Sequence, residues 1–113
     1  MDKRLIGKWY RPEMDETLNI LSLDPLRIKM SFASSGHYNF EPNCAYEKDG
    51  FLCYEINDEE NRMVYRVKLA EGYLDGCYTH QGKEAPVKYE RISETPDDEP
   101  YRFAPPEIYV PET

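Results

Sequence analysis

The sequence has little of what long helices, membrane spans and disulfide frameworks need. Alanine is scarce, and nine prolines and six glycines interrupt the chain too often for long helices. No apolar run approaches the roughly 18 residues of a membrane span, and none follows Met1–Arg4 as it would in a signal peptide. Three widely spaced cysteines, an odd number, form no disulfide framework, so we expect reduced thiols and a cytoplasmic location.

Positive charge is also scarce, with 14 lysines and arginines against 22 acidic residues and a net charge of -8. Nucleic acids and anionic membranes attract basic proteins, so we expect neither as a partner. The two histidines and three cysteines show no metal-ligand spacing, so we predict no metal site and no cofactor. There is no Gly-x-Ser-x-Gly motif, and Ser35 near His37 is interpreted as part of a polar turn, so we do not expect an enzyme.

What the chain does have is aromatic residues and alternating patterns, both of which favour β-strands. Ten tyrosines, four phenylalanines and one tryptophan are residue types enriched in strands. Between Leu26 and Phe32 every second residue is apolar, the period of a strand with one face in the core. Strands are predicted over residues 4–11, 18–23, 26–32, 37–41, 44–47, 51–56, 63–69, 73–80 and 86–92.

The connections between these strands are short, which sets the topology. Asp49-Gly50, Glu71-Gly72 and Gln81-Gly82 are tight-turn signals, and residues 51–92 are predicted to form a four-stranded antiparallel meander. Residues 12–16 are interpreted as a polar loop. We therefore predict an all-β domain over residues 1–93, an antiparallel up-and-down barrel of about eight short strands without free edges.

Two short motifs lie at the ends of the predicted barrel. Gly7-Lys8-Trp9 is in the first strand, and Arg91 is in the last. This pair resembles the Gly-x-Trp motif and the terminal basic residue of the lipocalins and the wider calycin superfamily. The resemblance implies that Arg91 packs on the face of Trp9 and closes the barrel, a contact that contributes about 0.5–2 kcal/mol.

The last part of the barrel is similar to a short lipocalin-like module of bacteria. The similarity rests on Gly72-Tyr73-Leu74-Asp75-Gly76, on Thr79-His80-Gln81-Gly82 and on the strand from Pro86 to Arg91. Such modules resemble stand-alone proteins or are fused to serine hydrolases of the α/β-hydrolase type. The resemblance covers about residues 4–92 and implies a barrel that can hold a small ligand.

The interior of the predicted barrel allows two interpretations. The residues expected to point inward are Leu26, Ile28, Met30, Phe32, Tyr38, Phe40, Leu52, Tyr54, Met63, Tyr65, Val67, Leu74 and Tyr78. These bulky side chains fill the barrel, or they leave a small pocket with aromatic walls for a small apolar or aromatic molecule. The candidate ligand-binding residues are Tyr38, Phe40, Tyr54, Tyr65 and Tyr78.

The C-terminal segment, residues 94–113, differs in composition from the barrel. It holds five of the nine prolines and six acidic residues against one basic residue, which predicts an extended tail. It also carries large apolar residues, so we expect the tail to dock. It packs on its own barrel, or it packs on a neighbouring copy and so forms a homodimer. The other interpretations are a linker and a solvated tail. The candidate docking residues are Tyr101, Phe103, Ile108 and Tyr109. The alternative function is accordingly a protein–protein interaction module with a filled barrel.

Overall fold

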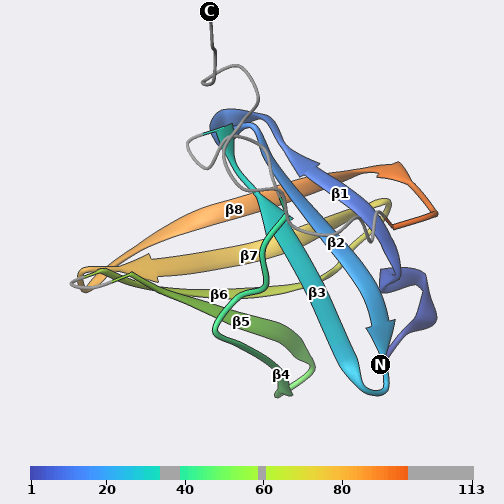
Figure 1. Cartoon of the computed structure of the whole chain (residues 1–113), viewed down its shortest axis with the longest axis horizontal. Coiled ribbons are helices and arrows are strands. Elements are labelled where there is room, and N and C mark those ends of the chain that lie inside the picture. The colour runs from blue at the N-terminus through green and yellow to red at the C-terminus, as the bar shows by residue number, and fades with distance from the viewer. Residues whose placement is uncertain (34–38, 59–60, 97–113) are drawn as a thin grey trace, which may run out of the picture.

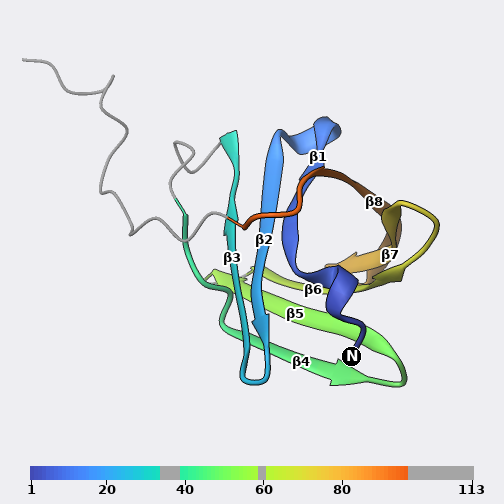
Figure 2. The same ribbon diagram turned by 90° about the vertical axis from the view of Figure 1, so that its right-hand side faces the viewer.

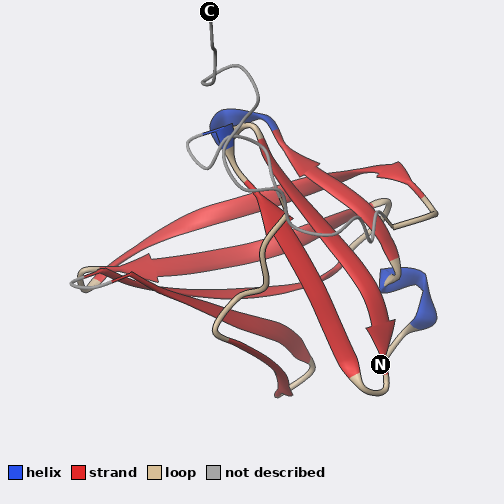
Figure 3. Cartoon of the chain, viewed as in Figure 1, coloured by secondary structure: helices blue, strands red, loops and turns tan. Residues whose placement is uncertain are grey.

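The computed structural model describes residues 1–33, 39–58 and 61–96, and in this part the chain is almost entirely β-structure (Figure 3). Two short 3-10 helices, η1 (Lys3–Leu5) and η2 (Pro12–Met14), flank the first strand. The strands are β1 (Gly7–Arg11), β2 (Glu16–Leu23), β3 (Leu26–Ser31), β4 (Cys44–Lys48), β5 (Phe51–Asp58), β6 (Asn61–Leu69), β7 (Tyr73–His80) and β8 (Lys83–Ser93). No helix among the described residues has the length and apolar character to cross a membrane.

The described strands form one antiparallel sheet in the order β3-β2-β1-β8-β7-β6-β5-β4. The sheet curls around a common interior, as Figures 1 and 2 show. Every pair of neighbours in the sheet apart from β1 and β8 is consecutive in the sequence. The prediction of an all-β, up-and-down barrel is confirmed, as is the four-stranded meander from β5 to β8.

The barrel is nearly closed, and the remaining gap lies between β3 and β4. These end strands are connected through a single bridge, in which Met30 and Phe40 exchange two backbone hydrogen bonds of 2.8 Å. The prediction of a barrel without free edges was therefore wrong at this seam. Pro42, just before β4, has no backbone N–H, so this segment lacks a donor with which a ladder could continue.

Two local predictions near the N-terminus were also wrong. Residues 4–6 belong to η1 and its C-terminal cap instead of a strand, because the Asp2 carboxylate accepts a hydrogen bond from the Arg4 amide and caps the helix. Residues 12–16 are more ordered than a polar loop, since Pro12 begins η2 and Asp15 adopts a left-handed conformation with φ of 48°. Glu16 is then the first residue of β2.

The turns behave as their sequences predict. Asp49 and Gly50 have φ values of 54° and 82°, and Gln81 and Gly82 have values of 55° and 77°. Positive φ at both positions defines the hairpin turn whose twist matches that of the flanking strands. These two turns set the register of β4 on β5 and of β7 on β8, and thereby decide which side chains face the interior.

The core contains the side chains that the alternation predicts to point inward. Of the thirteen predicted residues, Tyr38 lies outside the described residues, and the other twelve are buried in the core or pack against it. Additional core residues are Leu5, Trp9, Leu18, Ile20, Val87 and Tyr89. β8 ends at Ser93, and the predicted docking residues Tyr101, Phe103, Ile108 and Tyr109 lie outside the described residues.

Candidate functional site

The first and last strands meet where Trp9 and Arg91 pair across the sheet. Trp9 is fully buried, and the guanidinium carbon of Arg91 lies 4.3 Å from the centre of its ring. Arg91 donates hydrogen bonds to the backbone carbonyls of Ile6, at 3.1 Å, and of Arg4. The contact that the lipocalin resemblance implies is thus present, and it fastens the segment before β1 to β8.

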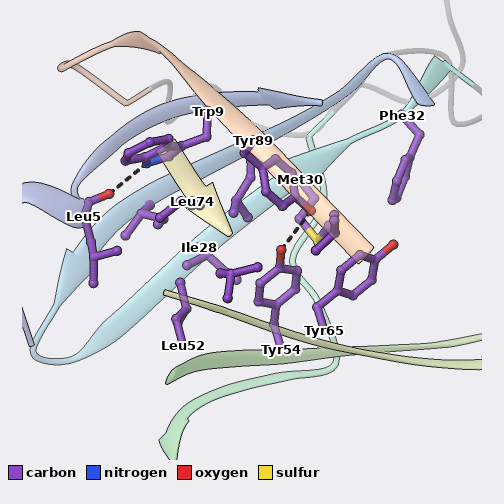
Figure 4. Packing of buried hydrophobic residues seen from close by; sticks show 14 residues of the cluster. Leu5, Trp9, Ile28, Met30, Phe32, Leu52, Tyr54, Tyr65, Leu74 and Tyr89 are labelled. Carbon is purple, nitrogen blue, oxygen red and sulfur yellow. Dashed lines mark hydrogen bonds between the residues drawn. The ribbon is translucent and has the colours of Figure 1, made fainter. Parts of the chain in front are cut away.

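The same contact seals one end of the core. The indole N–H of Trp9 donates a 2.9 Å hydrogen bond to the carbonyl of Leu5, whose side chain is buried beside it (Figure 4). Gly7, with φ of 150°, permits this arrangement, because a Cβ at this position would lie 2.7 Å from the backbone oxygen of Ser93. This end of the barrel is therefore apolar and held together by η1.

Three of the predicted site residues come together further along the interior. Tyr54, Tyr65 and Tyr78 are register partners on β5, β6 and β7, so their side chains follow one another on the inner face. The rings of Tyr54 and Tyr65 stack with centroids 4.8 Å apart, and those of Tyr65 and Tyr78 with centroids 5.3 Å apart. Tyr54 and Tyr65 are buried and Tyr78 is half-buried. We call these three residues the tyrosine column.

An ion pair lies beside the tyrosine column. The guanidinium of Arg11 lies 5.3 Å from the ring centre of Tyr78, and its Nε is 3.1 Å from Oε1 of Glu16. Only 5% of the Arg11 side chain and none of the Glu16 side chain is exposed. The two residues are opposite each other on β1 and β2, so the η2 connection brings them together.

A chain of hydrogen bonds links this ion pair to the column. The hydroxyl of Tyr54 donates to the hydroxyl of Tyr89 at 2.8 Å, and the hydroxyl of Tyr89 donates to Oε2 of Glu16. Figure 4 shows Tyr54 and Tyr89 pointing toward one another across the barrel. Burial raises the pKa of both hydroxyls well above the ordinary value, so both remain protonated donors at neutral pH.

The remaining predicted site residues are placed differently. Phe40 is half-buried and stacks on Phe32, with ring centroids 5.7 Å apart, at the seam between β3 and β4. Tyr38 lies outside the described residues. Within the described ranges, no group of three or more histidine, cysteine or acidic side chains could hold a metal ion.

The sequence interpretation missed three members of the site. Glu16 was assigned to a polar loop, and Tyr89 was placed in the last strand without a role in the interior. Arg11 carries a usable signal, because the alternation of Gly7, Trp9 and Arg11 puts all three side-chain positions on one face of β1. A charged residue on the face of a buried tryptophan indicates a polar site inside the core.

Burial raises the pKa of Glu16 from 4.5 to about 7, although the hydrogen bond from Tyr89 and the charge of Arg11 act in the opposite direction. Between these pH values the folded chain binds more protons than the unfolded chain. The free energy of unfolding is therefore expected to fall as the pH rises from about 4.5 to about 7, and to stay at the lower level above that.

The measurement is denaturant unfolding across this pH range for the wild type and for Glu16→Gln, which cannot ionise. The difference between the two curves isolates Glu16, because the other carboxyl groups contribute equally to both. We expect the wild type to lose stability relative to the variant as the pH rises. Parallel curves would show that the buried carboxyl does not titrate in this window.

Comparisons with protein-family models, with curated proteins and with solved structures found no match for this chain. The molecule is a nearly closed, antiparallel, eight-stranded β-barrel within its described residues, a fold that is compatible with binding a ligand. Any assignment of function therefore rests on the geometry and chemistry of the barrel interior.

Proposed function

We propose that this chain is a lipocalin-like binding protein, with a binding role and no catalytic one, that holds a small aromatic or apolar molecule at the tyrosine column. The observation that carries the proposal is the buried ion pair of Arg11 and Glu16 beside three stacked tyrosines inside a β-barrel. Ligand sites in proteins combine aromatic walls with a few placed polar groups, which is the composition of this region.

The energetics of the ion pair support a role other than stability. Removing two charges from water costs several kcal/mol per ion, and apolar residues of similar volume often stabilise a core as well or better. The opposite end of this same barrel is filled by Trp9, Leu5 and their apolar neighbours. A polar cluster at one end of an otherwise apolar interior is therefore best explained by something that it binds.

The hydroxyl groups differ in a way that fits this proposal. Those of Tyr54 and Tyr89 are used in the internal hydrogen-bond chain. Those of Tyr65 and Tyr78 make no hydrogen bond to another described residue, although Tyr65 is only 1% exposed. Two tyrosines thus hold the site in shape, while two have hydroxyl groups available to a ligand.

The three free cysteines support placing the protein in a cytoplasm, a compartment that keeps thiols reduced. The alternative proposal is an interaction module with a filled barrel, working through its aromatic C-terminal residues as a homodimer or with another partner. That alternative requires no ligand, so an experiment that looks for one separates the two proposals.

The test is native mass spectrometry of the protein from its source, combined with NMR of isotope-labelled tyrosine rings in the presence of small aromatic compounds. We expect a bound small molecule, and shifts of the Tyr65 and Tyr78 signals. Tyr46 and Tyr73, whose side chains contact Glu55 and Lys88, serve as internal controls that should not move. If the native mass is that of the protein chain alone, and the NMR signals of the tyrosine column do not shift, the proposal is contradicted and the interaction module is favoured.

A further inference from the structure

Polar side chains are buried on the outer face of the barrel, over the first three strands. Lys8, Asn19 and Lys29 are register partners and form one row across β1, β2 and β3. Each of them is followed in its strand by a residue of the core, so by alternation this row points out of the barrel. Nevertheless Asn19 is 0% exposed and Lys29 is 8% exposed, and Ser31, which also points outward, is 6% exposed.

The outer face of β6 and β7 shows the contrast with an uncovered surface. Arg66 and Lys68 on β6 and Asp75 on β7 point outward by the same alternation, and all three are exposed. Like β2, β6 has a neighbouring strand on both sides. The position of a strand in the sheet therefore does not bury its outward side chains. We conclude that a segment of this chain lies over Asn19 and Lys29.

The charges on the covered face are all positive. Its outward positions are Lys8, Tyr10, Thr17, Asn19, Arg27, Lys29 and Ser31. Three of these residues are cations, and none is acidic. A cation buried as deeply as Lys29 costs free energy unless an anion lies beside it. The segment that covers this face is therefore expected to supply acidic groups.

The end of β8 leads the chain onto this face. Ser93, the last residue of β8, is the register partner of Lys8. Its hydroxyl accepts a 3.0 Å hydrogen bond from the Thr95 amide, so the chain bends directly after the strand. Figure 2 shows the residues after β8 crossing in front of β1 and β2. Residues 94–99 read Glu-Thr-Pro-Asp-Asp-Glu, whereas residues 34–38, which follow β3, contain no acidic residue.

We propose that residues 94–99 form an acidic strap, which crosses the outer face of β1–β3 and places its carboxylates against Lys8 and Lys29. Neighbouring strands are about 4.8 Å apart, so Lys8 and Lys29 are separated by about 10 Å across the sheet. Three extended residues, from Glu94 to Asp97, span about the same 10 Å. Glu94 then lies beside Lys8, and Asp97 reaches Lys29. This inference does not depend on a ligand inside the barrel.

The acidic strap also determines where the rest of the C-terminal segment begins. A segment that crosses from β1 to β3 ends at the edge of the sheet, beside the gap between β3 and β4. Tyr101, the first of the predicted docking residues, follows Glu99 by two positions. The strap thus brings the aromatic residues that the interaction module requires to the unclosed seam of the barrel.

The first experiment is carbodiimide cross-linking of the full chain, which joins a lysine amine directly to a carboxylate in contact with it. An equimolar mixture of unlabelled and ¹⁵N-labelled chains distinguishes links within one chain from links between copies. We expect Lys8 or Lys29 to be linked to residues 94–99 in peptides that carry the same isotope. Lys68 and Asp75, register partners on exposed strand faces, are the positive control.

Two results would overturn the proposal. Peptide pairs of mixed isotope would mean that a second copy supplies the acidic groups, as in the homodimer interpretation. A link between Lys68 and Asp75 without any link from Lys8 or Lys29 to residues 94–99 would mean that another segment covers this face.

A matched pair of full-length variants tests the charges of the strap. Both variants neutralise a run of three acidic residues with amides of the same shape. The strap variant carries Asp97→Asn, Asp98→Asn and Glu99→Gln, and the control variant carries Asp58→Asn, Glu59→Gln and Glu60→Gln. Both changes remove three negative charges and leave every lysine in place, so only the strap variant should uncover Lys29.

The measurement is the rate at which each lysine amine is acetylated, read by mass spectrometry. In the wild type Lys29 should react about tenfold more slowly than the exposed Lys68, because a covered amine reacts only when the segment over it opens. The strap variant should raise the rate at Lys29 about fivefold or more, and the control variant should leave it unchanged. If Lys29 reacts as slowly in the strap variant as in the wild type, residues 97–99 do not hold this cover and the proposal fails.

Discussion

Replacing Arg11 with methionine is expected to lower the free energy of unfolding by about 3–5 kcal/mol. The side chain of Glu16 is completely buried, and Arg11 is the cation that compensates its charge. Without Arg11 the carboxylate remains in the core with only the hydroxyl of Tyr89 as a donor. The measurement is denaturant unfolding at about pH 8, above the pKa of about 7 that Glu16 has beside Arg11, and the loss should be larger there than at lower pH, where protonation of the carboxyl relieves it.

A double variant tests whether the loss comes from the unpaired charge. Arg11→Met combined with Glu16→Leu removes both charges and keeps side chains of similar length, so it should recover most of the stability that Arg11→Met loses. A double variant as unstable as Arg11→Met alone would mean that Arg11 contributes through packing on Tyr78 and not through Glu16.

Trp9→Ala is the second substitution with a large expected effect, a loss of about 3–5 kcal/mol in the free energy of unfolding. Trp9 is fully buried, its indole N–H is bonded to Leu5, and Arg91 lies on its ring. Alanine would leave a large cavity and would remove the contact between Trp9 on β1 and Arg91 on β8. Chemical denaturation of the purified variant measures this loss.

Ile92→Ala is the matched control for the Trp9 substitution. Ile92 follows Arg91 on the same strand, but 53% of its surface is exposed, so its truncation should change stability by about 0.5 kcal/mol or less. If Trp9→Ala costs under about 1 kcal/mol, Trp9 does not hold the seam between β1 and β8.

Local patterns were sufficient to predict most of the architecture. The alternation from Leu26 to Phe32 predicts β3, and Asp-Gly and Gln-Gly turns predict the hairpins, because side-chain period and turn conformation are properties of a few consecutive residues. The side chains predicted to point into the barrel follow from the same alternation. Three of the five candidate ligand-binding residues, Tyr54, Tyr65 and Tyr78, do stand side by side in the interior.

The positions of Glu16 and Tyr89 in the site could not be predicted from the local pattern. Glu16 follows Pro12, Glu13 and Asp15, and an acidic residue in such a run is ordinarily solvated. Tyr89 lies on β8, 35 residues from Tyr54 and 73 from Glu16, and hydrogen bonds nevertheless connect the three. Contacts over such separations depend on how the sheet curls, and no local sequence signal reports them. The gap between β3 and β4 was not predicted for the same reason, because it also depends on how the sheet curls.

The sequence by itself determined that the chain is an antiparallel β-barrel, and it identified twelve of the apolar and aromatic side chains that form or contact its core. The resemblance of Gly7-Lys8-Trp9 and Arg91 to the lipocalin motif also implied that Trp9 and Arg91 meet, as they do. Only the tertiary structure decided that one end of the barrel is apolar and sealed, while the other buries an ion pair beside the tyrosine column. The reason is physical, since the burial of a charge depends on side chains that close around it from β1, β2, β5, β7 and β8.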